Sequence, residues 1–111
     1  MSKATNRQIL CAAKLKTLAD ATRLHVVREL MRGAQSVGEL NMVIGLPQSL
    51  LSHHLKVLRS SGVVTAERVG KAVLYQLAPG VGQDAASQTL NLGCCALSFP
   101  TRRHPSPQSV V

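Results

Sequence analysis

The chain has 111 residues, a formal net charge of +8 and few aromatic side chains: one Tyr, one Phe and no Trp. This length suits one domain with a short tail and an aliphatic core. No apolar run approaches the ~20 residues of a membrane span, and the N-terminus lacks a signal-peptide core, so we expect a cytosolic protein. Its three cysteines should then be reduced thiols. A chain with this much positive charge favours a polyanionic partner. The alternative is that the charge only aids solubility.

Two helices are predicted in the first third of the chain. Apolar residues recur at helical spacing from Ile9 to Ala19. Asp20 is a good N-cap for a second helix over residues 21–31, which Gly33 ends. Three arginines of this second helix are expected to lie mostly outside the core: Arg23, Arg28 and Arg32.

Two further helices, joined by a tight turn, are predicted next. Ser36 caps a short helix over residues 37–44, with Glu39 at the spacing of a capping box. Pro47 opens the following helix, a position that Pro tolerates, and Gly62 ends it. The apolar positions of this helix fall at i, i+4 and i+7 and form one stripe: Leu51, Leu55 and Leu58. Two short helices joined in this way are typical of a helix-turn-helix.

The other face of the second of these helices carries polar and cationic side chains suited to base edges and phosphates. These residues are Gln48, Ser49, Ser52, His53, Lys56 and Arg59. The alternative is that some of them only solvate a helix face. His54 lies beside the apolar stripe, so a packed, hydrogen-bonded structural role is favoured for it over a DNA contact.

A β-hairpin is predicted directly after this helix. β-branched residues over 63–69 and 72–77 flank the two-residue turn Gly70-Lys71. Arg68 and Lys71 lie at the tip, where a basic hairpin forms a wing that can reach a phosphate strand or a minor groove.

The C-terminal part is less regular. A weaker helix is predicted over residues 84–92, and the Pro- and Ser-rich segment from Pro100 onward is expected to be disordered. We therefore expect a DNA-binding and dimerisation domain over residues 1–99 and a disordered tail over 100–111.

Several of these motifs, in this order, resemble the ArsR/SmtB family of winged helix-turn-helix repressors. Residues 18–24 read LADATRL, which is similar to the family's opening motif. Residues 48–64 resemble its recognition helix and strand entry, and residues 68–75 resemble its wing. The likeness covers about residues 9–77.

The resemblance implies a mainly α fold with one β-hairpin, acting as a homodimer through its first and last helices. It also implies binding to near-palindromic double-stranded operator DNA, release when an effector binds, and no permanently bound cofactor. On this basis base-proximal contacts are expected from Gln48, Ser52, His53 and Lys56. Phosphate contacts are expected from Arg59, Arg68 and Lys71.

Known metal sites of the family do not fit this chain. One type carries Cys-Val-Cys in the third helix, where this chain has Ser36 and Gly38. Another uses Asp, His and Glu on the last helix, but no His lies between His54 and His104. The remaining candidate ligands are Cys11, Cys94 and Cys95.

Adjacent cysteines have Cα atoms ~3.8 Å apart, below the usual disulfide range of about 4.4–6.8 Å. Cys94 and Cys95 are therefore better suited to holding one thiophilic ion, because thiolates select soft metals. Trivalent arsenic or antimony takes three sulfurs, and Cys11 can supply the third, from the same subunit or its partner. The alternatives are a redox or sulfane-sulfur sensor, in which Cys11 pairs with Cys94 or Cys95, and a Cys11 that is only a small core hydrophobe.

Two other classes of function fit the sequence less well. A thiol enzyme is disfavoured because the chain has no Cys-x-x-Cys and no substrate-binding signature. A winged helix used as a protein-interaction module is disfavoured by the polar face of the predicted recognition helix and by the charge of +8. We therefore predict a DNA-binding repressor and not an enzyme.

Overall fold

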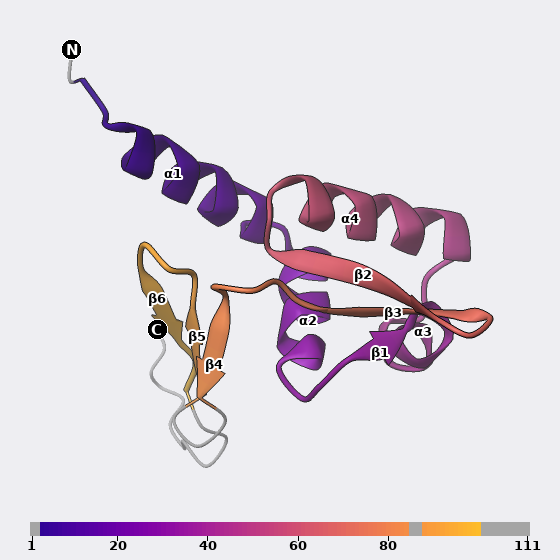
Figure 1. Cartoon of the computed structure of the whole chain (residues 1–111). Helices are drawn as coiled ribbons and strands as arrows, with labels where there is room; N and C mark the ends of the chain where they lie inside the picture. Colours follow the sequence, from indigo (N-terminus) through magenta and orange to yellow (C-terminus); the bar gives the residue numbers. More distant parts are fainter. Residues whose placement is uncertain (1–2, 85–87, 101–111) are drawn as a thin grey trace.

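The computed structural model describes residues 3–84 and 88–100. Helices dominate the first half of this part of the chain, and strands dominate the second (Figure 1). The helices are α1 (Asn6–Leu18), α2 (Ala21–Leu30), α3 (Val37–Ile44) and α4 (Gln48–Ser60). The strands are β1 (Gln35–Ser36), β2 (Val64–Val69), β3 (Ala72–Leu77), β4 (Gly82–Asp84), β5 (Thr89–Asn91) and β6 (Ala96–Ser98). None of the described helices combines the length and the apolar character needed to cross a membrane.

The predicted helix caps are confirmed. The Asp20 side chain accepts a hydrogen bond from the Arg23 backbone N–H at 3.0 Å. Ser36 and Glu39 form the reciprocal capping box at the start of α3. Pro47 is the N-cap of α4 and not its first helical residue, a shift of one position. Local side-chain chemistry therefore defines where these helices begin.

The predicted wing is also confirmed. β2 and β3 pair antiparallel, with Val69 opposite Ala72, so Gly70 and Lys71 form the turn between them. Gly70 has a φ of 64°, which its lack of a side chain permits. β1 adds to the other edge of β3 to give a three-stranded sheet. Figure 1 shows the tip of this hairpin projecting away from α1.

The helix predicted over residues 84–92 is wrong: β4, β5 and β6 form a second antiparallel sheet there. Residues 85–87 lie outside the described part of the chain. The physical reason is an alternation of period two, since Leu90 and Leu92 are fully buried while Asn91 between them is exposed. Leu97 also packs against the core from β6. A helix would have put Leu90 and Leu92 on different faces.

A single aliphatic core joins the helices to both sheets. The predicted apolar stripe of α4 is buried, with at most 1% of each side chain exposed in Leu51, Leu55 and Leu58. It belongs to the same cluster as Val27 of α2 and Leu90 of β5. The second sheet is thus fixed to the helical part, beneath α1 in Figure 1. The predicted tail over 100–111 lies, except for Pro100, outside the described residues.

Candidate DNA interface and thiol cluster

The outer face of α4 exposes every side chain of this helix that is predicted to meet DNA. The helix is fixed from behind by its buried leucines, so its polar residues are directed outward. The exposed set on this face is Gln48, Ser49, Ser52, His53, Lys56 and Arg59.

The turn between α3 and α4 is held by a residue that the sequence analysis missed. The Asn41 side chain donates to the Leu46 carbonyl at 2.6 Å and accepts from the Leu46 N–H at 2.8 Å. Gly45 adopts the left-handed conformation at the end of α3, with a φ of 71°. The signal was an Asn four residues before a Gly, because Asn side chains often bond to nearby backbone groups. Asn41 therefore sets how α4 is presented relative to α3.

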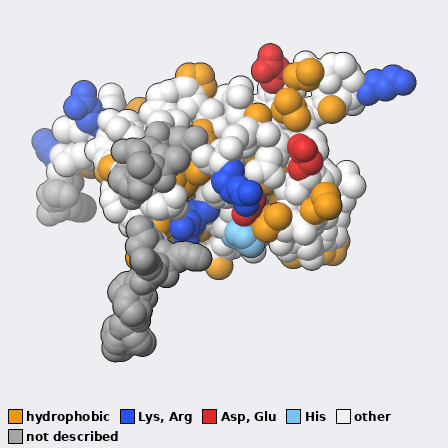
Figure 2. Space-filling model, turned by 90° about the horizontal axis from the view of Figure 1, so that it is seen from below, with side chains coloured by type: hydrophobic (Ala, Val, Ile, Leu, Met, Phe, Trp, Pro, Cys, Tyr) orange, Lys and Arg blue, Asp and Glu red, His pale blue; other side chains and the backbone are white. Residues whose placement is uncertain are grey.

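The tip of the wing carries two of the three predicted phosphate contacts. Arg68 near the end of β2 and Lys71 in the turn are both exposed. In Figure 2 a cationic side chain projects from the end of the molecule that Figure 1 identifies as the tip of this hairpin. The helix face and the wing can therefore both offer positive charge to a polyanion.

His54 has the structural role predicted for it. Its ring nitrogen Nδ1 lies 3.3 Å from Nη1 of Arg23, and the same arginine donates from Nε to the Thr17 carbonyl at 2.8 Å. Of the three arginines of α2 expected to lie mostly outside, Arg28 and Arg32 are exposed, but the Arg23 side chain is only 19% exposed. Its hydrogen bonds explain how a guanidinium is tolerated there. Arg23 thus connects the end of α1 to the recognition helix.

Asp20 completes this network. The hydrogen bond from the Arg23 backbone N–H lowers the pKa of its carboxyl below the ordinary value of 3.8, and the nearby charges of Arg23 and His54 act in the same direction. The Asp20 carboxylate and the Arg23 guanidinium approach to 3.9 Å.

The three cysteines come together in space, although Cys11 and Cys94 are 83 residues apart in the sequence. Cys11 lies on α1, and Cys94 and Cys95 lie in the turn between β5 and β6. Their three Sγ atoms all lie within 4.8 Å of one another, and each residue is half-buried. It is the one group of three potential metal-binding side chains among the described residues.

Within this cluster Cys11 and Cys94 form a disulfide, and Cys95 is a free thiol. The expectation of three reduced thiols is therefore not met. The reason is the second sheet, which brings the Cys11 and Cys94 Cα atoms to 5.8 Å, inside the usual bridging range. Sγ of Cys95 lies 3.5 Å from Sγ of Cys11.

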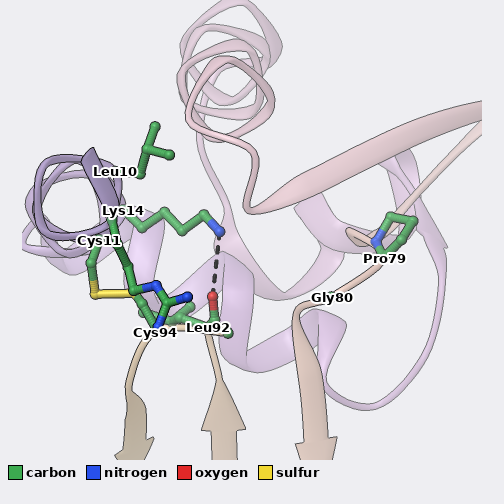
Figure 3. Close-up of a pocket in the computed structure, with 9 residues that line it drawn as sticks. Leu10, Cys11, Lys14, Pro79, Gly80, Leu92 and Cys94 are labelled. Atoms are coloured by element: carbon green, nitrogen blue, oxygen red, sulfur yellow. Dashed lines mark hydrogen bonds between the residues drawn. A yellow bond between two sulfur atoms is a disulfide. The ribbon is translucent and has the colours of Figure 1, made fainter. Parts of the chain in front are cut away.

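The turn that presents Cys94 and Cys95 is closely fixed. The Leu92 N–H donates to the Cys95 carbonyl at 2.8 Å, and the Gly93 N–H donates to the Asn91 side chain at 2.7 Å. Gly93 has a φ of 91°, and a Cβ there would lie 3.4 Å from the Gly80 carbonyl oxygen. Lys14 of α1 donates to the Leu92 carbonyl at 3.3 Å (Figure 3). The turn that carries Cys94 and Cys95 is therefore held in place and tied to α1, which carries Cys11.

Comparison with known proteins agrees with the winged helix-turn-helix fold. Residues 20–66 match the model of the family described as "Bacterial regulatory protein, arsR family". The transcriptional repressor SmtB of Mycobacterium tuberculosis is 46% identical over 74 residues, which cover 65% of this chain and 55% of SmtB. The chain thus spans about half the length of the curated relatives it matches. These relatives are named as transcriptional regulators, in keeping with the prediction that the chain is not an enzyme.

Solved structures with a similar fold include HlyU from Vibrio cholerae. That structure has a TM-score of 0.65 and 33% identity, and the match covers 68% of this chain and 83% of HlyU. The homodimeric winged helix-turn-helix DNA-binding domain of Mb0332 from Mycobacterium bovis has a TM-score of 0.61 and 28% identity, covering 71% of this chain and 77% of that one. The predicted winged helix-turn-helix fold is confirmed.

We predict that Asp20→Asn makes the protein less sensitive to acid while keeping the cap, since Asn caps a helix about as well as Asp but does not titrate. Because the pKa of Asp20 is lowered in the folded state, its stabilising contribution is present above pH 3.8 and is lost as the pH falls through the lower folded-state value. Urea unfolding at pH 7 and pH 3 should show a smaller loss for the variant than for the wild type. Equal losses would contradict this role.

Proposed function

Because the chain belongs to the ArsR family of bacterial regulatory proteins, we propose that it is a homodimeric transcriptional repressor whose hold on operator DNA is controlled by Cys11, Cys94 and Cys95. The proposed effector is trivalent arsenic or antimony. The observation that carries this proposal is the convergence of three sulfur atoms from two distant segments within 4.8 Å.

The DNA contacts proposed here follow from exposure and charge. Gln48, Ser52, His53 and Lys56 approach base edges in the major groove, while Arg59, Arg68 and Lys71 approach phosphates, and Ser49 lies in the first turn of the same helix. Pro47 provides no side-chain cap for α4. A phosphate oxygen near that end would therefore meet backbone N–H groups of the first turn.

The proposed dimer uses α1. Ile9 and Leu15 are apolar but 55% and 39% exposed, so α1 offers apolar side chains that a second copy can cover. The homodimeric domain of Mb0332, which has a similar fold, supports this assignment. A twofold dimer would present two copies of α4 to successive major grooves of a near-palindromic operator.

The effector site proposed here uses sulfur alone. Thiolates select soft, thiophilic ions, and three of them can surround one trivalent arsenic or antimony. The Cys11–Cys94 bond has to be reduced first, and each thiol then loses its proton on binding. Cys11 belongs to the same helix as the proposed dimer surface, and Arg23 joins the end of that helix to His54 on α4. Binding releases DNA to the extent that the effector prefers the form with low affinity for the operator.

A second candidate is control by thiol oxidation or sulfane sulfur, favoured by the disulfide between Cys11 and Cys94. Two thiols would give up two electrons and two protons to an oxidant such as a peroxide or a small-molecule disulfide. HlyU from Vibrio cholerae, which has a similar fold, has also been solved in a form described as reduced. Cys95, 3.5 Å from Cys11, is then positioned to exchange with this disulfide.

We predict different effects for two changes at the DNA surface. Lys71→Ala should weaken binding to operator and unrelated DNA alike and lower the log–log salt slope by about 0.9, since one phosphate contact is lost. Gln48→Ala should cost about 1–3 kcal/mol on the operator and relax its specificity. Fluorescence anisotropy at several salt concentrations measures both. Arg32→Ala, which removes a 75% exposed cation outside the helix-turn-helix and wing, is the control and should change neither. Unchanged operator affinity in both test variants would refute this docking.

We predict that arsenite releases the reduced protein from its operator and that Cys94→Ser with Cys95→Ser abolishes this response. Cys95→Ser alone should raise the required arsenite concentration at least tenfold, because one of three sulfurs is lost. Gel-shift titration measures the release, and Ala96→Ser, which adds a hydroxyl beside the site without removing sulfur, is the control. Release that survives the double substitution would exclude the pair as the sensor.

For the second candidate, we predict that the oxidised protein binds its operator at least tenfold more weakly than the reduced protein, with no metalloid present. Cys11→Ser should remove this difference because it leaves neither Cys94 nor Cys95 a partner on α1, whereas Cys95→Ser should retain it because Cys11 and Cys94 can still bond. Anisotropy with protein kept in a phosphine reductant or oxidised with a small-molecule disulfide provides the measurement. Equal affinities of oxidised and reduced wild type would argue against redox control.

A further inference from the structure

A pocket of about 540 Å³ adjoins the disulfide (Figure 3). Its walls are α1, the connection from β3 to β4 at Pro79 and Gly80, and the turn at Gly93 and Cys94. This volume is in the range of small-molecule sites in proteins. Cys11 and Cys94 both line the pocket, while Cys95 does not. A small molecule in it would thus meet both sulfurs of the disulfide.

The charge of the pocket is entirely positive. Arg7, Cys11 and Lys14 follow one another at i, i+4 and i+7 and so lie along one face of α1. Arg7 and Lys14 are the charged residues among those that line the pocket, and no Asp or Glu lines it. Among the described residues, neither cation has a carboxylate partner within 4.0 Å. The pocket therefore favours an anion.

We propose that this pocket binds a low-molecular-weight thiol that carries carboxylates, and that this thiol opens the Cys11–Cys94 disulfide. The inference rests on the second candidate function above, control by thiol oxidation. The carboxylates pair with Arg7 and Lys14, and the apolar side chain of Leu10 contacts the body of the ligand. These contacts hold the ligand's sulfur beside the disulfide.

The step is a thiol–disulfide exchange. The ligand's thiolate attacks Sγ of Cys94, forming a mixed disulfide, while the Cys11–Cys94 bond breaks and Cys11 leaves as a thiolate. Cys11 is the better leaving group because it stands between the two cations of α1, which stabilise a negative sulfur. The proton lost by the incoming thiol ends on Cys11. A second thiol molecule attacks the mixed disulfide, releases the ligand as its own disulfide and leaves Cys94 reduced.

The test compares two small thiols on the oxidised protein. Glutathione carries two carboxylates and a net negative charge, whereas cysteamine carries a positive charge and no carboxylate. Reactions are quenched with an alkylating agent, and intact mass spectrometry follows the mixed disulfide and the opened form. Per thiolate, glutathione should react at least tenfold faster than cysteamine, and added salt should reduce this ratio, because the attraction is electrostatic. A ratio near one for the wild type would overturn the proposal.

Variants identify the cations responsible. Arg7→Gln and Lys14→Gln should each lower the ratio several-fold, whereas Lys16→Gln, an exposed lysine of α1 that does not line the pocket, should leave it unchanged. Arg7 is exposed, so its variant serves even if loss of the Lys14–Leu92 hydrogen bond disturbs the fold. A ratio unaffected in both test variants would also overturn the proposal. The measurement contains no DNA, so its result is separate from any failure of redox control at the operator.

Discussion

The arrangement of the whole site depends on the burial of Leu90 and Leu92 in the same aliphatic core as the leucines of α4. Both side chains are fully removed from solvent, and each such burial contributes about 1.5–3 kcal/mol. This burial holds the second sheet beneath α1. The turn after Leu92 therefore lies beside Cys11, and its hydrogen bonds restrict its movement.

Helix α1 takes part in three tasks at once. It carries Cys11 and the cations of the adjoining pocket, it exposes apolar side chains to a second copy of the chain, and the Thr17 carbonyl near its end accepts from Arg23. Arg23 in turn meets His54 on the recognition helix. A change in the bonding of Cys11 therefore acts on α1. This helix carries the proposed dimer surface, and Arg23 connects it to α4. Such a change alters affinity only if it favours one arrangement of that helix over another.

The helical half was predictable because its signals are local. Asp20 and Ser36 cap helices through atoms three residues away, and the stripe from Leu51 to Leu58 is a property of one helix. The second sheet was not predicted, because Leu90 lies in a three-residue strand and Leu92 directly follows it, so the alternation spans only a few residues. Arg23 was misjudged because its partners, Thr17 and His54, belong to other helices.

The sequence by itself determined the helix-turn-helix, the wing and the exposed polar face of α4, because periodicity, capping and turn chemistry act over a few residues. It also identified three cysteines as candidate functional residues but did not determine which of them bond. Only the tertiary structure decided that Cys11 and Cys94 bond, that Cys95 lies beside them and that two cations border the disulfide. These contacts join segments more than eighty residues apart in the sequence. A shared hydrophobic core brings the segments together, and no local sequence pattern predicts that contact.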